Sequence, residues 1–278
     1  APPAGPARPA AAVAGVLLSG ALLAGCGTSS AAERVDVYAA SSLTGALTGL
    51  AAEFEAEHPG VDVALNFAGS ADLAVQIAEG APADVFVAAD DETMRRVLDS
   101  GRASGTPEVL ATNRLTIAVA EGNPLGLRSP ADLDRAGVTT VVCAEQVPCG
   151  RAARTLVERA GVELRPASEE SSVTDVVGKL RTGQADAGLV YVTDVAAHED
   201  VLDGVPVEAA ADAANAYTVV GVEGGPRDRA EQFVAFVTGP AGQERLAELG
   251  FDPGPAPPHG AGPGASSPDD QDPTTSTR

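Results

Sequence analysis

The sequence predicts an α/β fold made of two lobes with a cleft between them. Strand and helix patterns alternate along the chain, and this rhythm is typical of open sheets whose mostly parallel strands are connected by helices. The alternation starts again at about residue 115, which indicates a second unit of the same kind. Two late helix patterns could return to the first unit. In such sheets, ligands bind beyond the carboxyl ends of the strands, where helices begin.

The first unit opens with an alternating apolar strand and a helix with one apolar face. Leu43, Leu47, Leu50 and Phe54 are spaced by four, three and four residues, as on one side of a helix. The elements expected in this unit are a strand over 35–38, a helix from 43 that ends before 58–60, a strand over 61–67, a helix over 70–80 and a strand over 84–88.

The second unit repeats this order. A strand is expected over 115–120, followed by a helix that begins at Ser129-Pro130 with a capping serine. The elements expected after it are a strand over 138–142, helices over 150–160 and 173–182, a strand over 187–190, a strand over 218–222, and helices over 227–238 and 241–249.

The two ends of the chain differ from the folded region. Residues 10–24 are uncharged and too short to span a membrane as a helix, so residues 1–26 are expected to be an export signal. The quartet that ends at Cys26, LAGC, resembles the lipobox of bacterial lipoproteins, which implies a lipid anchor on Cys26. Residues 27–34 are expected to form a tether, and the Pro- and Gly-rich residues 253–278 a disordered tail.

The charge balance excludes some partners. Acidic residues outnumber basic ones 39 to 18, which gives a formal net charge of −21. Such a chain is a poor partner for nucleic acid or acidic lipid, because both are attracted by positive charge. A small anion bound by uncharged donors at short range is still compatible with this balance.

Two further cysteines, Cys143 and Cys149, lie close together in sequence. Export to an oxidising compartment favours a disulfide between them. Zinc is the alternative, but structural zinc sites use four nitrogen or sulfur ligands, and no histidine lies near these cysteines in sequence.

Four junctions between loops and helices carry small or polar residues: Ser41-Ser42, Gly69-Ser70, 148–150 and 171–173. Each helix start presents free backbone N–H groups and the positive end of the helix dipole. Together the four junctions could therefore form an anion site. Taken singly, each serine is explained more simply as a helix cap, and that interpretation still fits one of Ser41 and Ser42.

Several segments resemble, in the same order, segments of the periplasmic molybdate-binding proteins of ABC importers. They are AASSLTGAL, NFAGSADLAVQIAEGAPADVFVAAD over 66–90, VPCG over 147–150 and ADAGLVYVTD over 185–194. The resemblance covers nearly all of 35–252. It implies a type II periplasmic-binding-protein fold with lobe 1 over 35–113 plus 217–252 and lobe 2 over 114–216.

The resemblance also implies a set of ligand-binding residues. In that family two serines, backbone N–H groups and one tyrosine hydroxyl hold the oxyanion in the cleft between the lobes. By position, these groups correspond to Ser42, Ser70, the N–H groups of Cys149 and Val173, and Tyr191. Molybdenum would be bound only as its oxyanion, without a metal cation site or a cofactor.

The function implied is capture of molybdate, and of tungstate because it is nearly the same size, for permease and ATPase subunits. The protein is expected to act as a monomer, anchored by lipid at the outer face of the cell membrane. A hinge motion about 112–115 and 216–218 should close the lobes around the ligand.

Two alternatives stay open from the sequence. Another oxyanion such as sulfate shares the charge and shape of molybdate, and the sequence does not reveal the cavity size. A serine-dependent enzyme would need a base near Ser42 or Ser70, and none of the three histidines is placed there. The prediction is therefore a binding protein and not an enzyme.

Overall fold

The computed structural model describes residues 33–225 and 227–254. The expected export signal, the expected lipid attachment site Cys26, most of the expected tether and nearly all of the expected tail lie outside these residues. None of the described helices has the length and apolar character needed to cross a membrane.

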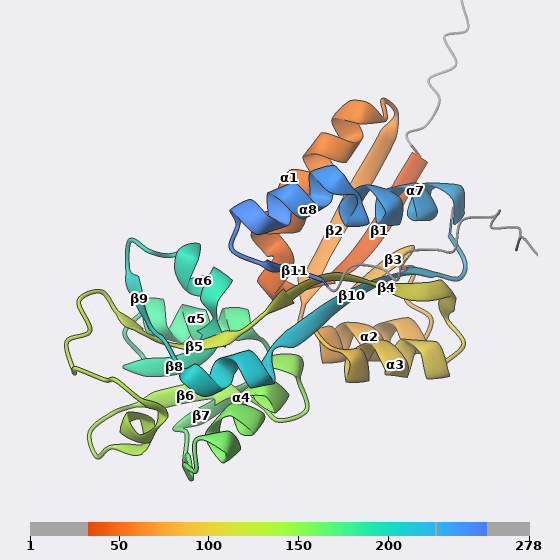
Figure 1. The fold of residues 1–278 in the computed structure, drawn as a ribbon. Helices are drawn as coiled ribbons and strands as arrows, with labels where there is room; N and C mark the ends of the chain where they lie inside the picture. The colour runs from red at the N-terminus through yellow and green to blue at the C-terminus, as the bar shows by residue number, and fades with distance from the viewer. Residues whose placement is uncertain (1–32, 226, 255–278) are drawn as a thin grey trace, which may run out of the picture. The chain divides into compact units, whose positions relative to one another are not determined.

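The first sheet has the strand order β11-β4-β10-β3-β1-β2 (Figure 1). Helices α1, α7 and α8 pack on one of its faces and α2 and α3 on the other. Val85 and Val87 of β3 belong to one core and Phe86 and Ala88 to the other, as alternation along a strand requires. The strands are β1 (Glu33–Ala40), β2 (Val61–Ala68), β3 (Val85–Ala88), β4 (Ala103–Asn113), β10 (Asn215–Val222) and β11 (Asp252–Pro253); the helices are η1 (Ser41–Leu43), α1 (Thr44–Glu57), α2 (Ser70–Ala78), α3 (Asp91–Asp99), α7 (Arg227–Thr238) and α8 (Pro240–Glu248).

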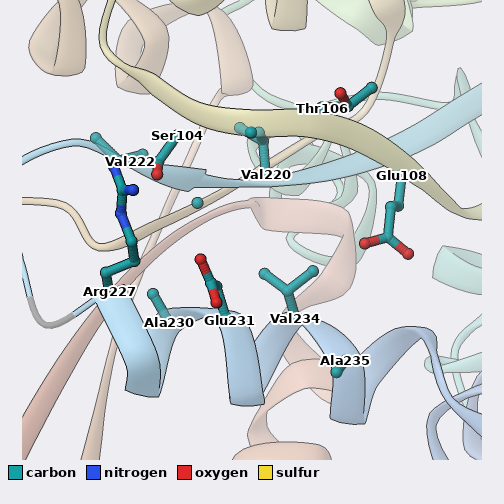
Figure 2. A pocket seen from close by; sticks show the side chains of 12 residues that line it. Ser104, Thr106, Glu108, Val220, Val222, Arg227, Ala230, Glu231, Val234 and Ala235 are labelled. Carbon is teal, nitrogen blue, oxygen red and sulfur yellow. The ribbon is translucent and has the colours of Figure 1, made fainter.

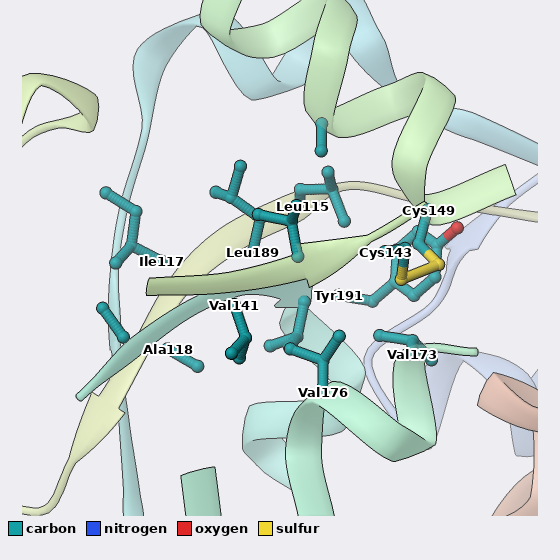
Figure 3. Close-up of a cluster of buried hydrophobic side chains, with 14 of the residues drawn as sticks. Leu115, Ile117, Ala118, Val141, Cys143, Cys149, Val173, Val176, Leu189 and Tyr191 are labelled. Carbon is teal, nitrogen blue, oxygen red and sulfur yellow. A yellow bond between two sulfur atoms is a disulfide. The ribbon is translucent and has the colours of Figure 1, made fainter. Parts of the chain in front are cut away.

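The second sheet has the strand order β7-β6-β8-β5-β9 and a separate core. Figure 3 shows part of this core, with Val176 of α5 below β6 and the paired cysteines at its edge. The strands are β5 (Leu115–Ala120), β6 (Thr140–Cys143), β7 (Ser168–Glu170), β8 (Ala187–Tyr191) and β9 (Leu202–Val205); the helices are η2 (Pro130–Asp134), α4 (Pro148–Arg159), α5 (Val173–Arg181), α6 (Val192–Ala196) and η3 (Glu208–Ala213).

The structure confirms the two-lobed α/β fold class, and both sheets are mixed. Strands β1 and β2 pair in parallel, as do β6 and β7. The chain leaves the carboxyl ends of these four strands and enters η1 with α1, α2, α4 and α5 respectively. Parallel strands in one sheet end at the same edge, so the helix starts gather there. The antiparallel pairs involve β4, β10 and β11 in the first sheet and β5 with β8 and β9 in the second.

Several predicted boundaries were wrong. Strand β1 begins at Glu33, so Glu33 and Arg34 of the predicted tether belong to the sheet, and Pro253 of the predicted tail pairs in β11. Strand β10 begins at Asn215, so Asn215 and Ala216 belong to the first sheet rather than the second lobe. The helix predicted after Ser129 is a single short 3-10 segment.

The pattern also gave no element over residues 91–113, where the structure has α3 and β4. Helix α3 buries only Thr93, Met94 and Val97, so its apolar face is too narrow to stand out in sequence. Strand β4 contains Gly105 and Pro107 and pairs with β10 through register shifts. Glycine and proline interrupt a strand pattern, because one weakens the strand and the other removes a backbone donor.

Candidate functional site

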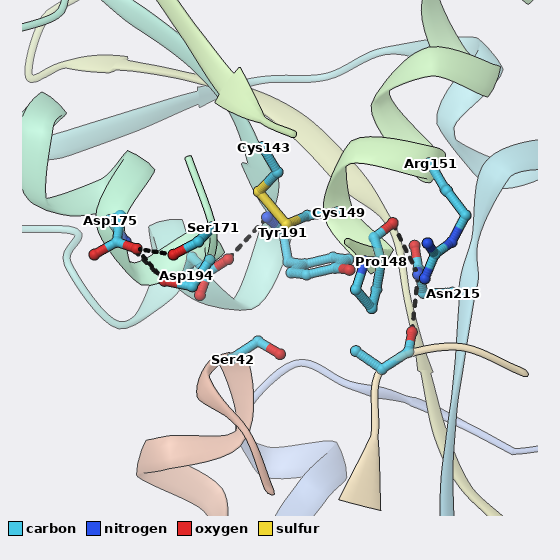
Figure 4. The surroundings of a disulfide bond; sticks show 12 residues. Ser42, Cys143, Pro148, Cys149, Arg151, Ser171, Asp175, Tyr191, Asp194 and Asn215 are labelled. Carbon is cyan, nitrogen blue, oxygen red and sulfur yellow. Dashed lines mark hydrogen bonds between the residues drawn. A yellow bond between two sulfur atoms is a disulfide. The ribbon is translucent and has the colours of Figure 1, made fainter. Parts of the chain in front are cut away.

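Residues predicted from all four junctions line one cavity between the lobes. The structure brings together Ser42 and Ser70 from the first lobe with Cys149, Val173 and Tyr191 from the second. Figure 4 shows Ser42 on one side and Cys149, Pro148 and Tyr191 opposite. The other lining residues are Ala40, Ser41, Gly69, Ala89, Val147, Pro148, Ser171 and Ser172.

The cavity has a volume of about 20 Å³. This volume exceeds the roughly 10–15 Å³ that one water molecule needs. It is far below the roughly 300–1,000 Å³ of pockets for drug-sized molecules. The cavity therefore offers little more room than one water molecule needs and excludes drug-sized ligands.

Ser42 does not cap a helix, contrary to the simple interpretation of its junction. Ser41 and Ser42 form η1, and neither hydroxyl bonds to the start of η1 or α1. The Ser42 hydroxyl instead lies 2.9 Å from the hydroxyl of Tyr217, in β10. The turn is fixed by Thr44, whose hydroxyl donates to the Ser41 carbonyl over 2.7 Å. The Ser42 side chain is thus free to take part in a site.

Ser70 is the first residue of α2 and is almost completely buried. Its oxygen accepts the N–H of Ala89 over 3.2 Å, so it does not cap α2 either. A hydroxyl that accepts one hydrogen bond still has its own proton to donate. Because Ser70 lines the cavity, that proton is available to a solute there.

Cys149 and Val173 contribute backbone N–H groups. Both residues lie in the first turn of their helices, α4 and α5, where N–H groups have no acceptor within the helix. The positive ends of the two helix dipoles add to this electropositive character. Ser172, in contrast, is a true cap, since its oxygen accepts the N–H of Asp175 and its proton goes to the Asp175 carboxylate.

A disulfide connects the start of α4 to the end of β6. Cys143 at the end of β6 and Cys149 form a disulfide, with 5.6 Å between their Cα atoms. The disulfide occupies both sulfur atoms, which rules out the zinc alternative at this pair. It links the N–H group of Cys149 directly to the second sheet.

Tyr191 places a hydroxyl without a partner at the cavity. The side chain is only 1% exposed, and its hydroxyl oxygen has no partner within hydrogen-bonding distance among the described residues, although the Tyr217 hydroxyl is close enough to contribute to its raised pKa. Burial raises the pKa of Tyr191 well above its ordinary value, so the hydroxyl keeps its proton. A buried hydroxyl without a partner costs about 1–3 kcal/mol. A solute that accepts this proton would remove that cost.

Asp194 is hydrogen-bonded to the backbone of Tyr191. One carboxylate oxygen accepts the backbone N–H of Tyr191 over 2.9 Å. Burial raises the pKa of Asp194 to about 7, and the bond from the Tyr191 N–H opposes the shift only in part. Asp194 is therefore partly protonated near neutral pH, which limits the negative charge close to the cavity.

The cavity is lined without formal charge. Among the described residues that line it, none is Asp, Glu, Lys, Arg or His. Its polar groups are hydroxyls and N–H groups at helix starts, an arrangement that favours anions. The geometry can hold a small anion by hydrogen bonds alone.

Contacts around the cavity hold the lobes together, and the sequence did not reveal them. Arg151 of α4 reaches the first lobe and pairs with Asp90 over 2.5 Å, while also donating to the Thr93 hydroxyl. Asn215 of β10 donates to the carbonyl of Ala89 within the first lobe over 2.8 Å, and it also reaches the carbonyl of Pro148 in the second lobe over 3.5 Å. These partners are far apart in sequence, so no local pattern links them.

Gly69 marks the closest approach of the two backbones. A Cβ atom at residue 69 would lie 2.4 Å from the carbonyl oxygen of Ser171 in the other lobe. Only glycine permits this contact without a shift of one lobe. The lobes therefore meet directly beside Ser70.

Three larger pockets have a different character, and one of them, of about 660 Å³, is lined mainly by charged side chains such as Glu145, Arg151 and Arg154. One of about 650 Å³ also touches Ser41 and Ser42 but extends to Arg181, Asp194 and His198. Another, of about 200 Å³, lies between β4, β10 and α7 (Figure 2) and contains none of the predicted site residues. The pocket of about 650 Å³ also lies between the lobes, but it contains charged side chains and lacks Ser70, Cys149 and Tyr191.

Comparisons with known proteins agree with this picture. The family model for bacterial extracellular solute-binding proteins matches residues 35–252. The molybdate-binding protein ModA of Mycobacterium tuberculosis is 44% identical over 226 residues, which cover 81% of this chain and 87% of that protein.

Two solved structures show the same fold. The periplasmic molybdate-binding protein of Azotobacter vinelandii superposes with a TM-score of 0.67 at 21% identity, over 78% of this chain and 98% of that one. The sulfate-binding protein SubI of Mycobacterium tuberculosis gives a TM-score of 0.71 at 17% identity, over 80% and 87% of the two chains.

The raised pKa of Asp194 predicts a pH dependence of stability. The pKa of Asp194 is about 7 in the folded protein and near 4 in the unfolded chain, so the folded protein holds the Asp194 proton more tightly. This proton stabilises the fold fully below pH 4, and the stabilisation is lost as the pH rises to 7. Asp194→Asn keeps an oxygen for the Tyr191 N–H but does not titrate.

We expect the free energy of unfolding of the wild type, relative to Asp194→Asn, to fall between pH 4 and pH 7 by at most about 4 kcal/mol. Urea unfolding of both proteins across this range measures the difference. A difference that does not change with pH would contradict the assignment.

Proposed function

The chain belongs to the family of bacterial extracellular solute-binding proteins, and we propose that it captures molybdate outside the cytoplasm and delivers it to an ABC importer. Its serines then act as ligand donors and not as nucleophiles, since the family consists of binding proteins and not of enzymes. The observation that carries the proposal is the buried Tyr191 hydroxyl without a partner, at a cavity lined by uncharged donors from both lobes.

The expected donors to the oxyanion are the hydroxyls of Ser42, Ser70 and Tyr191 and the N–H groups of Cys149 and Val173. Hydrogen bonds to a charged group contribute about 1.5–3 kcal/mol each, so this set supplies roughly 7–15 kcal/mol before the costs of binding. Association costs at least about 4 kcal/mol. The remainder is compatible with a Kd in the micromolar range or below, which corresponds to about −8 kcal/mol.

The chemistry of the cavity favours a fully deprotonated anion. Molybdate and tungstate only accept hydrogen bonds, and the five groups can donate one each. Hydrogen phosphate carries a proton that needs an acceptor, and a donor-only site leaves it without one. Sulfate is the second candidate, because it has the same charge and shape and differs from molybdate mainly in size.

Export and anchoring complete the proposal. Residues 1–26 would direct export, Cys26 would carry the lipid anchor, and a tether would connect it to β1. Lobe 1 would comprise 35–113 with the returning segment that ends at 252, and lobe 2 the residues between. A monomer without a cofactor would pass its ligand to permease and ATPase subunits in the membrane.

Ligand capture should involve closure of the lobes. The chain crosses from one sheet to the other between Asn113 and Leu115 and returns into β10 at Asn215. These short crossings are suited to a hinge, because motion there leaves both cores intact. The contacts of Gly69 and of Arg151 with the opposite lobe belong to the closed state.

Titration calorimetry of the ligand-free protein tests the ligand assignment. Molybdate and tungstate should bind tightly and hydrogen phosphate weakly. Ser42→Ala and Ser70→Ala should each weaken molybdate binding about 10- to 150-fold, because each removes one bond to a charged group.

Ser172→Ala is the matched control, since Ser172 lines the same cavity but is committed to Asp175. It should change the affinity less than threefold and cost about 1 kcal/mol of stability as a lost cap. Tight sulfate binding with none for molybdate would overturn the ligand assignment.

Substitution of Gly69 tests closure. In Gly69→Ala the added Cβ would collide with the Ser171 carbonyl, so we expect the molybdate Kd to rise at least about tenfold while the ligand-free protein unfolds at nearly the same temperature. Gly178→Ala, in α5 with open space around the new Cβ, should leave the affinity unchanged. Equal affinity in the Gly69 and Gly178 variants would show that the lobes do not approach as described.

A further inference from the structure

Tyr217 lies next to the cavity without lining it. The residue belongs to β10, the strand by which the chain returns from the second lobe, and its side chain is completely buried. The rings of Tyr191 and Phe251 pack against its ring with centroid distances of 5.9 and 5.6 Å. These contacts fix the position of the Tyr217 hydroxyl, which lies 2.9 Å from that of Ser42.

Two hydroxyls that share a hydrogen bond can be arranged in two ways, because either can donate. If Ser42 donates to Tyr217, the Ser42 oxygen presents only lone pairs to the cavity and repels an anion. If Tyr217 donates, the Ser42 proton is left for the anion. Burial raises the pKa of Tyr217, so its hydroxyl keeps the proton that the second arrangement requires.

We propose that Tyr217 is a positioning residue that donates to the Ser42 oxygen and thereby turns the Ser42 proton toward the bound oxyanion. The inference rests on the proposed function, since it concerns how the same site holds its ligand. Tyr217 makes no direct contact with the ligand. It acts through Ser42, and it links the first helix start to a strand 175 positions away in the sequence.

The test uses Tyr217→Phe, which removes the hydroxyl and keeps the ring that packs on Tyr191 and Phe251. We expect the molybdate Kd to rise about tenfold, which corresponds to about 1.4 kcal/mol. Tyr38→Phe is the matched control, because Tyr38 is on β1 of the same sheet and does not line the cavity. It should change the Kd less than twofold, and thermal unfolding should show that both variants are folded.

A double-mutant cycle separates positioning from a general structural role. If Tyr217 acts through Ser42, adding Tyr217→Phe to Ser42→Ala should weaken molybdate binding less than twofold further. A tenfold loss in both backgrounds would overturn the inference and leave the proposed function intact, as would a Tyr217→Phe protein that binds like the wild type. A wild-type protein that binds no oxyanion would overturn both.

Discussion

The convergence of uncharged hydrogen-bond donors from two lobes is the constraint on which the rest of the structure depends. An acidic chain of net charge −21 can hold an anion only if the attraction acts at short range. Helix starts meet this need, because their N–H groups and dipoles are fixed by the fold. The parallel pairs β1–β2 and β6–β7 bring the starts of α1, α2, α4 and α5 to the edges that face each other.

Several other features follow from this constraint. The residues that line the cavity belong to two lobes, so under the proposed function binding would be coupled to the approach of the lobes. The close approach seen in the structure requires a glycine at position 69, and the Arg151–Asp90 pair also connects the lobes. The Arg151 guanidinium is paired with Asp90 and lies outside the cavity, so the cavity lining carries no formal charge.

The residues that line the cavity could be picked out in the sequence because most of them lie at helix starts, which have short, local sequence patterns; their role as donors to a ligand stays a prediction. Prediction failed where the information was not local. Ser41 and Ser42 look like caps in the sequence, but they lie in a 3-10 turn, and the Ser42 hydroxyl pairs with that of Tyr217, a partner 175 positions away. The interlobe contacts of Arg151 with Asp90 and of Asn215 with Pro148 were missed for the same reason, and β4 was missed because glycine and proline interrupt its pattern.

The central claim is that the small interlobe cavity is where the oxyanion binds. A crystal structure of the protein with molybdate, with the molybdenum located by its anomalous scattering, tests this claim most directly. We expect one anomalous peak, for a molybdate whose oxygens lie within hydrogen-bonding distance of Ser42, Ser70 and Tyr191 and of the N–H groups of Cys149 and Val173. A peak beside Arg181 and His198 in the larger pocket, with the small cavity empty, would contradict it.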